Sequence, residues 1–294
     1  MPMIPPEIIL QVEKFISGQQ KFAAAVSCTS PVGGGCINRA FCLEAGETKY
    51  FLKWNDAGKY PGMFEAEAKG LKLLRDAGVI KIPRVFRTET AGTYSFILME
   101  WIEQGSRKSS FWNDFGKSLA HLHSHTQEQF GLDHDNYIGS LSQSNRQCGS
   151  WIEFFMHERI EPQWKLAVNT GKLADLPIGQ LANLERILPE IIPDEKPALL
   201  HGDLWNGNFL VDTEGAACLI DPAVYYGHRE MDLAMTKLFG GFDPEFYRSY
   251  QAEFPLEKGF ESRLDIHNLY PLLVHVNLFG GGYVQQVKNI LSRF

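Results

Sequence analysis

The stretch HGDLWNGN at residues 201–208 is polar, contains two glycines and lies between two short apolar runs. The run ALL at 198–200 precedes it, and the run FLV at 209–211 follows it. Short apolar runs on either side of a polar, glycine-containing segment are typical of two strands joined by a loop. We therefore expect residues 201–208 to form a loop that exposes its polar side chains between two strands.

Three residues with oxygen-bearing side chains are spaced characteristically around this loop. Asn208 follows Asp203 by five positions, and Asp221 follows Asn208 by thirteen, after the apolar run ACLI at 217–220. Kinase catalytic loops have this D-x-x-x-x-N spacing, and a metal-binding aspartate follows on the next strand. We predict that Asp203 accepts the proton of the phosphorylated hydroxyl, and that Asn208 and Asp221 bind Mg²⁺, which prefers oxygen ligands. Turn formation alone would explain one such pair, but it explains both spacings poorly.

Residues upstream of the loop form a candidate site for ATP. Gly34 and Gly35 belong to a glycine triplet between two expected strands, where backbone amides could approach phosphates; a simple hairpin turn is the alternative. Lys53 is a lone cation in the apolar run FLKW at 51–54 and could contact the α- and β-phosphates. The alternative for Lys53 is an ordinary lysine on an edge strand.

A buried lysine needs an anionic partner, and the helix expected at 62–76 offers Glu65 and Glu67. Glu67 lies one and two helical turns before Leu71 and Leu74, so it shares their inward face. We prefer Glu67 for this reason.

The run FILMEWI at 96–102 ends the expected sheet. We expect the backbone of Glu100, Trp101 and Ile102 to line the floor of the cleft, where an adenine edge could pair. Taken alone, the run would be an ordinary core strand.

The pattern along the chain predicts an α+β protein with the two lobes of the protein-kinase-like fold. The first lobe, residues 1–102, would hold a helix at 5–17 and a five-stranded antiparallel sheet together with the helix at 62–76. Its strands are expected at 23–28, 39–43, 50–54, 84–89 and 94–100. The second lobe, residues 103–294, would be mainly helical, with helices at 111–127, 151–168, 179–192, 231–239, 244–254 and 264–294.

The composition limits the partners and the compartment. The formal charge of −7 argues against nucleic acid or an anionic membrane as the main partner, because both attract basic surfaces. No apolar stretch approaches the roughly 20 residues that span a bilayer. The five cysteines are widely spaced and odd in number, so we expect neither a disulfide framework nor a zinc site. We predict a cytoplasmic protein without a membrane partner.

Six segments together resemble the fructosamine kinases, or ketosamine kinases, which are relatives of aminoglycoside and choline kinases within the protein-kinase-like superfamily. The resemblance runs nearly from end to end, and HGDLWNGN with DPAVYYGHRE is its most specific part. The segments are GGGCIN at 33–38, FLKWN at 51–55, MFEAEAKGL at 63–71, PALLHGDLWNGN at 197–208, DPAVYYGHREMDLA at 221–234 and FGGF at 239–242.

The resemblance implies ATP-dependent phosphorylation of the sugar moiety of ketosamines at the 3-hydroxyl, on small adducts or on protein-bound ones, and an association with deglycation. It implies the roles given above for Asp203, Asn208, Asp221, Lys53 and Glu67, and for the hinge at 100–102. It further implies that Trp205 offers a face to the sugar ring or the amine-bearing side chain, and that His275 lies near the sugar.

Two places in the chain qualify the resemblance. The segment 127–150 differs from the longer insertions of animal members, which puts acceptor recognition in doubt. Cys36, in the glycine-rich loop, matches a cysteine common in the family and could respond to oxidants or form an intermolecular disulfide. A homodimer is one assembly that such a disulfide would give.

Other classes of function stay open at this point. They are a kinase of another small hydroxylated amine, a nucleotide-binding relative without catalysis, and a metal-dependent hydrolase built on His201, Asp203, His228 and Asp221.

Several further residues have alternative interpretations. Asp232 is expected to brace the catalytic loop. The residues YY and HR at 225–226 and 228–229 could be acceptor contacts or an equivalent of the activation segment. The histidines of AHLHSH at 120–125 are expected to be structural rather than metal ligands.

Overall fold

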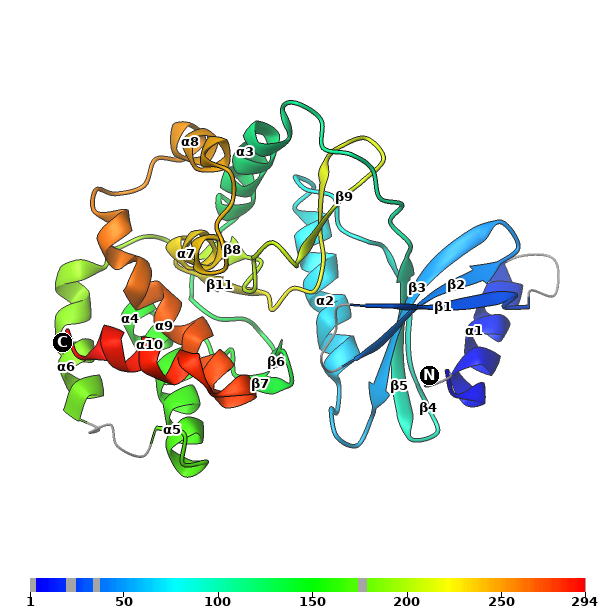
Figure 1. Cartoon of the computed structure of the whole chain (residues 1–294), viewed down its shortest axis with the longest axis horizontal. Helices are drawn as coiled ribbons and strands as arrows, with labels where there is room; N and C mark the ends of the chain where they lie inside the picture. The colour runs from blue at the N-terminus through cyan, green and yellow to red at the C-terminus, as the bar shows by residue number, and fades with distance from the viewer. Residues whose placement is uncertain (1–3, 20–24, 34–37, 174–178, 294) are drawn as a thin grey trace.

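The computed structural model describes residues 4–19, 25–33, 38–173 and 179–293. Figure 1 shows a sheet flanked by helices at one end of the molecule and a cluster of helices at the other. The predicted α+β class and two-lobed, protein-kinase-like fold are therefore confirmed.

The N-terminal sheet is antiparallel throughout, and its strand order is β1-β2-β3-β5-β4. A helix separates β3 from β4 along the chain, as expected. The strands are β1 (Cys28–Val32), β2 (Arg39–Ala45), β3 (Thr48–Asp56), β4 (Val85–Ala91) and β5 (Tyr94–Glu100).

The position expected for the first strand, 23–28, was wrong. Its described residues 25–27 lie outside any strand, and pairing with β2 begins at Cys28 opposite Glu44. Residues 23 and 24 lie outside the described residues, and β1 itself contains the exposed Pro31. Edge strands tolerate proline because one side of them donates no ladder hydrogen bonds.

Two helices cover opposite faces of this sheet (Figure 1). Alternate residues of β5 point to opposite faces, as in any strand. Phe96 and Leu98 pack with helix α1 (Pro6–Gln19), whereas Ile97 and Met99 pack with helix α2 (Met63–Asp76). The N-terminal helix is thus a brace on the outer face, and α2 lies on the face toward the second lobe.

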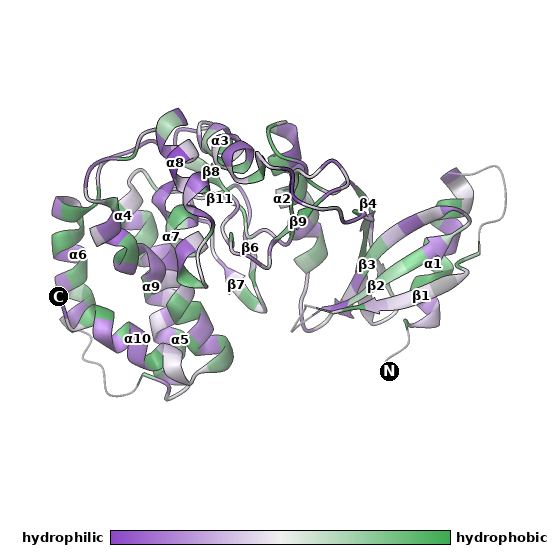
Figure 2. Ribbon diagram, turned by 45° about the horizontal axis from the view of Figure 1, so that its top comes forward, coloured by the Kyte–Doolittle hydropathy of each residue, from purple (hydrophilic) through white to green (hydrophobic). Residues whose placement is uncertain are grey.

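The C-terminal lobe is mainly helical, as predicted. Hydrophobic and hydrophilic residues alternate along α6 and α10 in Figure 2, which is the pattern of helices with one buried face. The helices are α3 (Phe111–His123), α4 (Trp151–Phe154), the π-helix η1 (Phe155–Ile160), α5 (Glu161–Asn169), α6 (Gly179–Ile191), α7 (Glu230–Leu238), α8 (Pro244–Glu253), α9 (Phe260–Phe279) and α10 (Gly282–Leu291).

Three of the expected helices differ from the structure by more than one residue at an end or are divided, and the other three differ by a single residue at one or both ends. The helix expected at 111–127 ends at His123, because Leu199 N–H donates to the carbonyl of His125 and Thr126 forms a bridge with Ala198. The helix expected at 151–168 is a run of α4, η1 and α5. The pattern at 264–294 is divided into α9 and α10 where glycines adopt positive φ angles.

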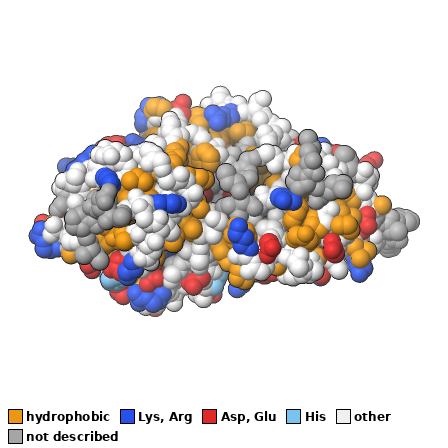
Figure 3. All heavy atoms as spheres, turned by 60° about the horizontal axis from the view of Figure 1, so that its bottom comes forward, with side chains coloured by type: hydrophobic (Ala, Val, Ile, Leu, Met, Phe, Trp, Pro, Cys, Tyr) orange, Lys and Arg blue, Asp and Glu red, His pale blue; other side chains and the backbone are white. Residues whose placement is uncertain are grey.

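Three short antiparallel ribbons complete the second lobe: β6 (Asn136–Ile138) with β7 (Leu141–Gln143), β8 (Ala198–Leu200) with β11 (Tyr225–Gly227), and β9 (Phe209–Val211) with β10 (Ala217–Leu219). Within the described residues, none of the helices has both the length and the apolar character that crossing a bilayer requires. On the face seen in Figure 3, side chains of both charges are interspersed rather than gathered by sign.

Candidate active site

The loop at 201–208 lies between β8 and β9, as the flanking apolar runs predict. These two strands pair with later strands: β8 with β11, and β9 with β10. The residues between β10 and β11, including Asp221, are therefore brought beside the loop. Two backbone hydrogen bonds hold the segments together, from Ile220 N–H to Asn208 O at 3.1 Å and from Ala223 N–H to His201 O at 2.9 Å.

Asp232, at the start of α7, braces the loop as expected. Its carboxylate accepts hydrogen bonds from the backbone N–H groups of His201 (2.7 Å) and Gly202 (2.9 Å). Gly202 has a φ angle of +82°, and a Cβ atom there would lie 2.0 Å from Ala223 O. This position therefore requires glycine. The brace fixes the backbone directly before Asp203.

Asn208 closes the loop onto Asp203. Its Nδ2 donates to the backbone oxygen of Asp203 at 2.7 Å and to Oδ2 at 2.9 Å. Burial raises the pKa of Asp203 to about 7, although the hydrogen bond from Asn208 acts in the opposite direction. A carboxylate whose pKa lies near neutral pH is well suited to accept a proton.

Lys53 on β3 joins carboxylates from both lobes. Its Nζ lies 2.8 Å from Glu67 Oε1 on α2, and it also donates to Asp221 Oδ1. Glu65 is exposed, so the structure pairs Lys53 with the glutamate that the helical spacing favours. Burial alone would lower the pKa of Lys53, but the Asp221 and Glu67 carboxylates more than offset this and raise it. Lys53 is thus a charged ammonium at the boundary of the lobes.

Asp221 has an unusual backbone conformation. Its φ angle is +55°, and no other non-glycine residue in the described part of the chain has a positive φ. Strained residues of this kind are concentrated at functional sites. Its side chain is 45% exposed, in contrast to the buried Lys53.

The remaining residues expected near the nucleotide are only partly placed. Gly34, Gly35 and Cys36 lie outside the described residues. Glu100 ends β5, and its side chain accepts a hydrogen bond from Arg84 N–H at 3.1 Å. Trp101 and Ile102 come next in the chain. The Trp101 ring packs against the Phe51 ring, and Ile102 is buried.

The connection that follows the hinge contacts the ribbon beside the catalytic loop, because Gly105 N–H donates to Val211 O at 2.9 Å. The expected hinge therefore ends beside β9 and β10. Its contacts with a nucleotide remain a prediction.

Trp205 and His275 are linked by an aromatic side chain that the sequence reasoning did not assign. The Phe239 ring centroid lies 5.9 Å from that of Trp205 and 4.9 Å from that of His275. Tyr283 lies 4.9 Å from His275 on the other side. Phe239 begins the FGGF segment, which was a signal for its importance.

A cavity beside Asp203 brings the catalytic loop and α9 together. Asp203 and His275 both line it, and Ile138 of β6 forms part of its wall. Its other lining residues are mainly apolar or aromatic and include Tyr225, Met235 and Tyr270. The cavity therefore places the candidate base beside a mainly apolar and aromatic wall.

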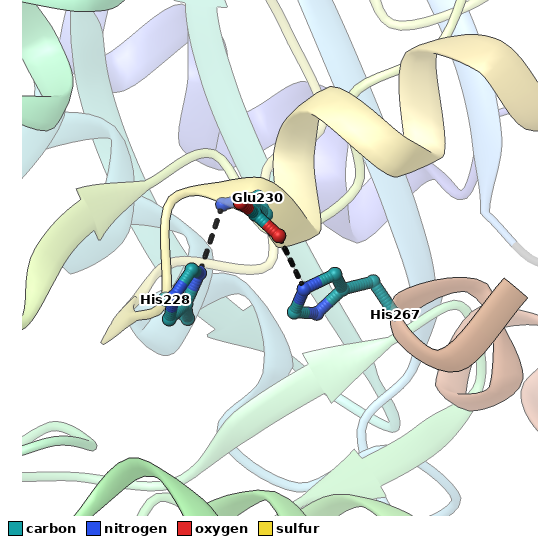
Figure 4. Close-up of side chains that lie close together, drawn as sticks. All are labelled: His228, Glu230 and His267. Carbon is teal, nitrogen blue, oxygen red and sulfur yellow. Dashed lines mark hydrogen bonds and ion pairs between the residues drawn. The ribbon is translucent and has the colours of Figure 1, made fainter. Parts of the chain in front are cut away.

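A second cluster of polar side chains is buried behind the loop (Figure 4). Glu230 accepts hydrogen bonds from His267 Nε2 at 2.9 Å and from two nitrogens of Arg263, and its own N–H donates to His228 Nδ1. In the described part of the chain, His228, Glu230 and His267 form the only group of three or more histidine, cysteine or acidic side chains that lie close enough together to share a metal. The Arg263 guanidinium already occupies both oxygens of Glu230, so this is a buried ion network rather than a metal centre.

Contacts in the structure also decide between the alternative interpretations of several other residues. His228 faces Glu230 and the backbone of Pro193 at 3.2 Å, so it supports no hydrolase site with Asp203. Tyr225 lines the cavity, which favours the acceptor alternative for that position. Two of the three histidines of the segment AHLHSH have structural side-chain contacts: His121 with Glu253 and His123 with Tyr250, each at 2.8 Å.

Comparisons with known proteins agree on one family. The model of the fructosamine kinase family matches residues 9–294. A Synechocystis protein named probable ketoamine kinase is 42% identical over 264 residues, which cover 89% of this chain and 88% of the relative. The chloroplastic protein-ribulosamine 3-kinase of Oryza sativa subsp. japonica is 38% identical over 279 residues, covering 92% and 80%. The crystal structure of a Haemophilus somnus protein assigned as a fructosamine-3-kinase superposes with a TM-score of 0.89 at 27% identity, covering 97% and 99%.

Proposed function

The chain belongs to the fructosamine kinase family, and we propose that it transfers the γ-phosphoryl group of ATP to the 3-hydroxyl of a ketosamine. The observation that carries this proposal is that Asp203 lines a cavity together with His275, while the hydrogen bond from Ile220 N–H to Asn208 O holds the residues before Asp221, the partner of Lys53, beside the same loop. The catalytic loop thus contacts both the cavity proposed for the acceptor and the segment that carries Asp221, which is proposed to hold the phosphates through a metal.

Asp203 is proposed as the base. In the transfer, the acceptor oxygen forms a bond to the γ-phosphorus, the bond from that phosphorus to the β,γ-bridging oxygen breaks, and the hydroxyl proton passes to the Asp203 carboxylate. Asn208 holds one oxygen of this carboxylate, and Asp232 holds the backbone before it. Both contacts limit the orientations that the carboxylate can adopt, which is the main contribution a protein makes to phosphoryl transfer.

The nucleotide side is proposed to use Lys53, with Glu67 as its partner, for the α- and β-phosphates. The glycines at 34–35 and the hinge at 100–102 would contact the phosphates and the adenine. Asn208 and Asp221 fit Mg²⁺. Asn208 donates its NH₂ group to Asp203, which leaves its amide oxygen for the metal, and Asp221 presents a half-exposed carboxylate. The metal would screen the charge of the phosphates when it is bound.

The acceptor side is proposed to use Trp205 and His275. The exposed ring of Trp205 offers an apolar face within the catalytic loop, and an aromatic face suits both a sugar ring and a protonated amine. Ketosamines combine these two features. The resulting sugar 3-phosphate adduct is unstable in this family, so the proposed role in the cell is deglycation.

A coupled assay of ADP release tests the function. Lysine adducts of fructose, ribulose and erythrulose serve as acceptors, and an aminoglycoside and choline serve as comparisons. We expect ADP release with at least one ketosamine, together with a phosphorylated adduct of matching mass. Turnover with the aminoglycoside or choline and none with any ketosamine would point to a different acceptor class.

Location and assembly complete the proposal. Cys148 and Cys218 are buried thiols outside any disulfide, which fits a reducing cytoplasm. A homodimer linked through Cys36 is proposed as an oxidised form, although Cys36 lies outside the described residues. Chromatography with and without reductant separates these forms, and a molecular mass that is the same in both conditions would argue against the disulfide.

A further inference from the structure

The β6–β7 hairpin lies between the helical lobe and α2 (Figures 1 and 2). It belongs to the segment 127–150, whose composition alone gave no functional assignment. Its strands are only three residues long, so the backbone ladder itself contributes little rigidity. Its position therefore depends on side-chain hydrogen bonds.

Buried amide groups fix the base of the hairpin to the residues that follow Asp221. Asn136 Nδ2 donates to Val224 O at 2.8 Å, and Gln143 Nε2 donates to Asn136 Oδ1 at 2.7 Å. Gln143 also contacts the carbonyl of Ala223 and accepts a hydrogen bond from Tyr270. Fully satisfied buried networks of this kind hold a single arrangement. The hairpin and the segment after Asp221 thus form one unit.

Two neighbouring residues of β6 reach different sites. Ile138 is buried and lines the cavity beside Asp203. Tyr137, which points to the other face of the strand, donates its hydroxyl to Pro61 O at 2.9 Å. Pro61 lies directly before Gly62, the N-cap residue of α2. One strand therefore contacts both the acceptor cavity and the start of the helix that carries Glu67.

The second contact between α2 and the same unit lies further along the helix. A Cβ atom on Gly70 would lie 3.1 Å from Val224 Cγ2, so helix and segment approach closely there. Between the two contacts lies Glu67, which pairs with Lys53. A helix is stiff over one or two turns, so a shift of its start would move Glu67 relative to Lys53. In protein kinases this lysine–glutamate pair has to be in place for phosphoryl transfer.

We infer that Tyr137 is a positioning residue for the proposed kinase reaction: its hydrogen bond to Pro61 holds α2 so that Glu67 stays on Lys53. The expected effect on kinetics rests on the proposed function. The expected effect on ATP affinity does not, because it depends only on the position of Glu67 relative to Lys53. The hairpin is then the element through which the acceptor cavity and the nucleotide site are held in register.

The test is a double-mutant cycle of Tyr137→Phe and Glu67→Gln. The first substitution removes one hydroxyl, and the second removes the charge through which that hydroxyl is inferred to act. The Kd for ATP with magnesium is measured by calorimetry for the wild type, both single variants and the double variant. The kcat/KM for ATP at saturating ketosamine is measured alongside, and the transition temperature of each protein is recorded.

We expect Tyr137→Phe to weaken ATP binding and to lower kcat/KM by about twofold to fivefold in the wild type, the usual effect of one partly solvated hydrogen bond. In the Glu67→Gln background the same substitution should have almost no effect, because coupled residues are not additive. Tyr247→Phe is the matched control: its hydroxyl contacts Thr236 and Phe242 but not α2, so its kinetics should match the wild type.

An equal loss in both backgrounds would overturn the inference, because Tyr137 would then act independently of Glu67. An unchanged Kd and kcat/KM for Tyr137→Phe in the wild type would overturn it as well. If no ketosamine is phosphorylated, the proposed function fails, but the four Kd values still decide the role of Tyr137.

Discussion

Lys53 and Glu67 form an ion pair across the face of the sheet, with Nζ and Oε1 2.8 Å apart and only 7% and 11% of the two side chains exposed. The same ammonium donates to Asp221, which belongs to the loop after β10. One buried cation therefore contacts a helix of the first lobe and the proposed metal ligand of the second. We therefore expect substitutions of Lys53, Glu67 and Asp221 to have different effects on stability and on nucleotide binding.

Lys53→Met should destabilise the protein more than Glu67→Gln. The first leaves a buried carboxylate without a cation, which costs about 3 kcal/mol, whereas the second leaves Lys53 its contact with Asp221 and costs about 1 kcal/mol. Urea unfolding measures both free energies. Equal losses would mean that Asp221 does not stabilise Lys53 in the absence of Glu67.

Asp203→Ala should abolish phosphoryl transfer with little effect on ATP binding. Loss of a positioned base lowers the rate by about a hundredfold or more, but Asp203 has no proposed contact with the nucleotide. Asp221→Ala should lower the rate and also weaken binding of ATP with magnesium. ADP-release kinetics and calorimetry separate the two effects, and normal turnover of Asp203→Ala would contradict the mechanism.

The sequence predicted the parts of the site that depend on local pattern. The strand expected at 94–100 is β5 with the same bounds, because its apolar residues are bounded by clear turn signals. Glu67 could be distinguished from Glu65 because Leu71 and Leu74 define the inward face of α2. Asp203, Asn208 and Asp221 came from spacing, and the two ribbons bring them together.

The sequence could not predict what depends on distant partners. The β6–β7 hairpin has strands of three residues, and it is held by bonds such as Asn136 to Val224, 88 positions away. No local pattern reveals that pairing. Phe239 was passed over for a related reason: its importance comes from lying between Trp205 and His275, which are distant in sequence.

Trp205→Ala should raise the KM for the ketosamine by about tenfold and leave the Kd for ATP unchanged. The ring is 37% exposed and packs edge-on against Phe239, so its removal deletes an apolar face without opening the core. Leu166→Ala on α5 is the matched control, because that side chain is also 37% exposed. An equal KM for the Trp205 variant and the control would remove Trp205 from the acceptor site.

His228 should make the protein less stable at acid pH, whereas Asp203, whose pKa is raised to about 7, should act in the opposite direction. Burial, and to a smaller extent the nearby His267, lowers the pKa of His228 to about 4 from the ordinary 6.5. The geometry agrees, because neutral His228 accepts the N–H of Glu230 at Nδ1 and donates from Nε2 to Pro193 O. Protonation of Nδ1 would remove the acceptor.

The sign of the pH effect follows from proton binding. Between pH 6.5 and 4 the unfolded chain holds a proton on His228 and the folded chain does not, so stability falls as the pH decreases through this range. By pH 5 the loss from this residue is about 2 kcal/mol. Buried His201, whose pKa is also lowered, adds to the same trend.

Urea unfolding at intervals between pH 7.5 and 5 measures this dependence. His228→Asn keeps an acceptor near Nδ1 but has no titrating group, so its stability should fall less steeply with decreasing pH than that of the wild type. His125→Asn changes an exposed histidine and should keep the wild-type slope. If the slopes of the wild type and His228→Asn coincide, the buried network around Glu230 does not keep His228 neutral.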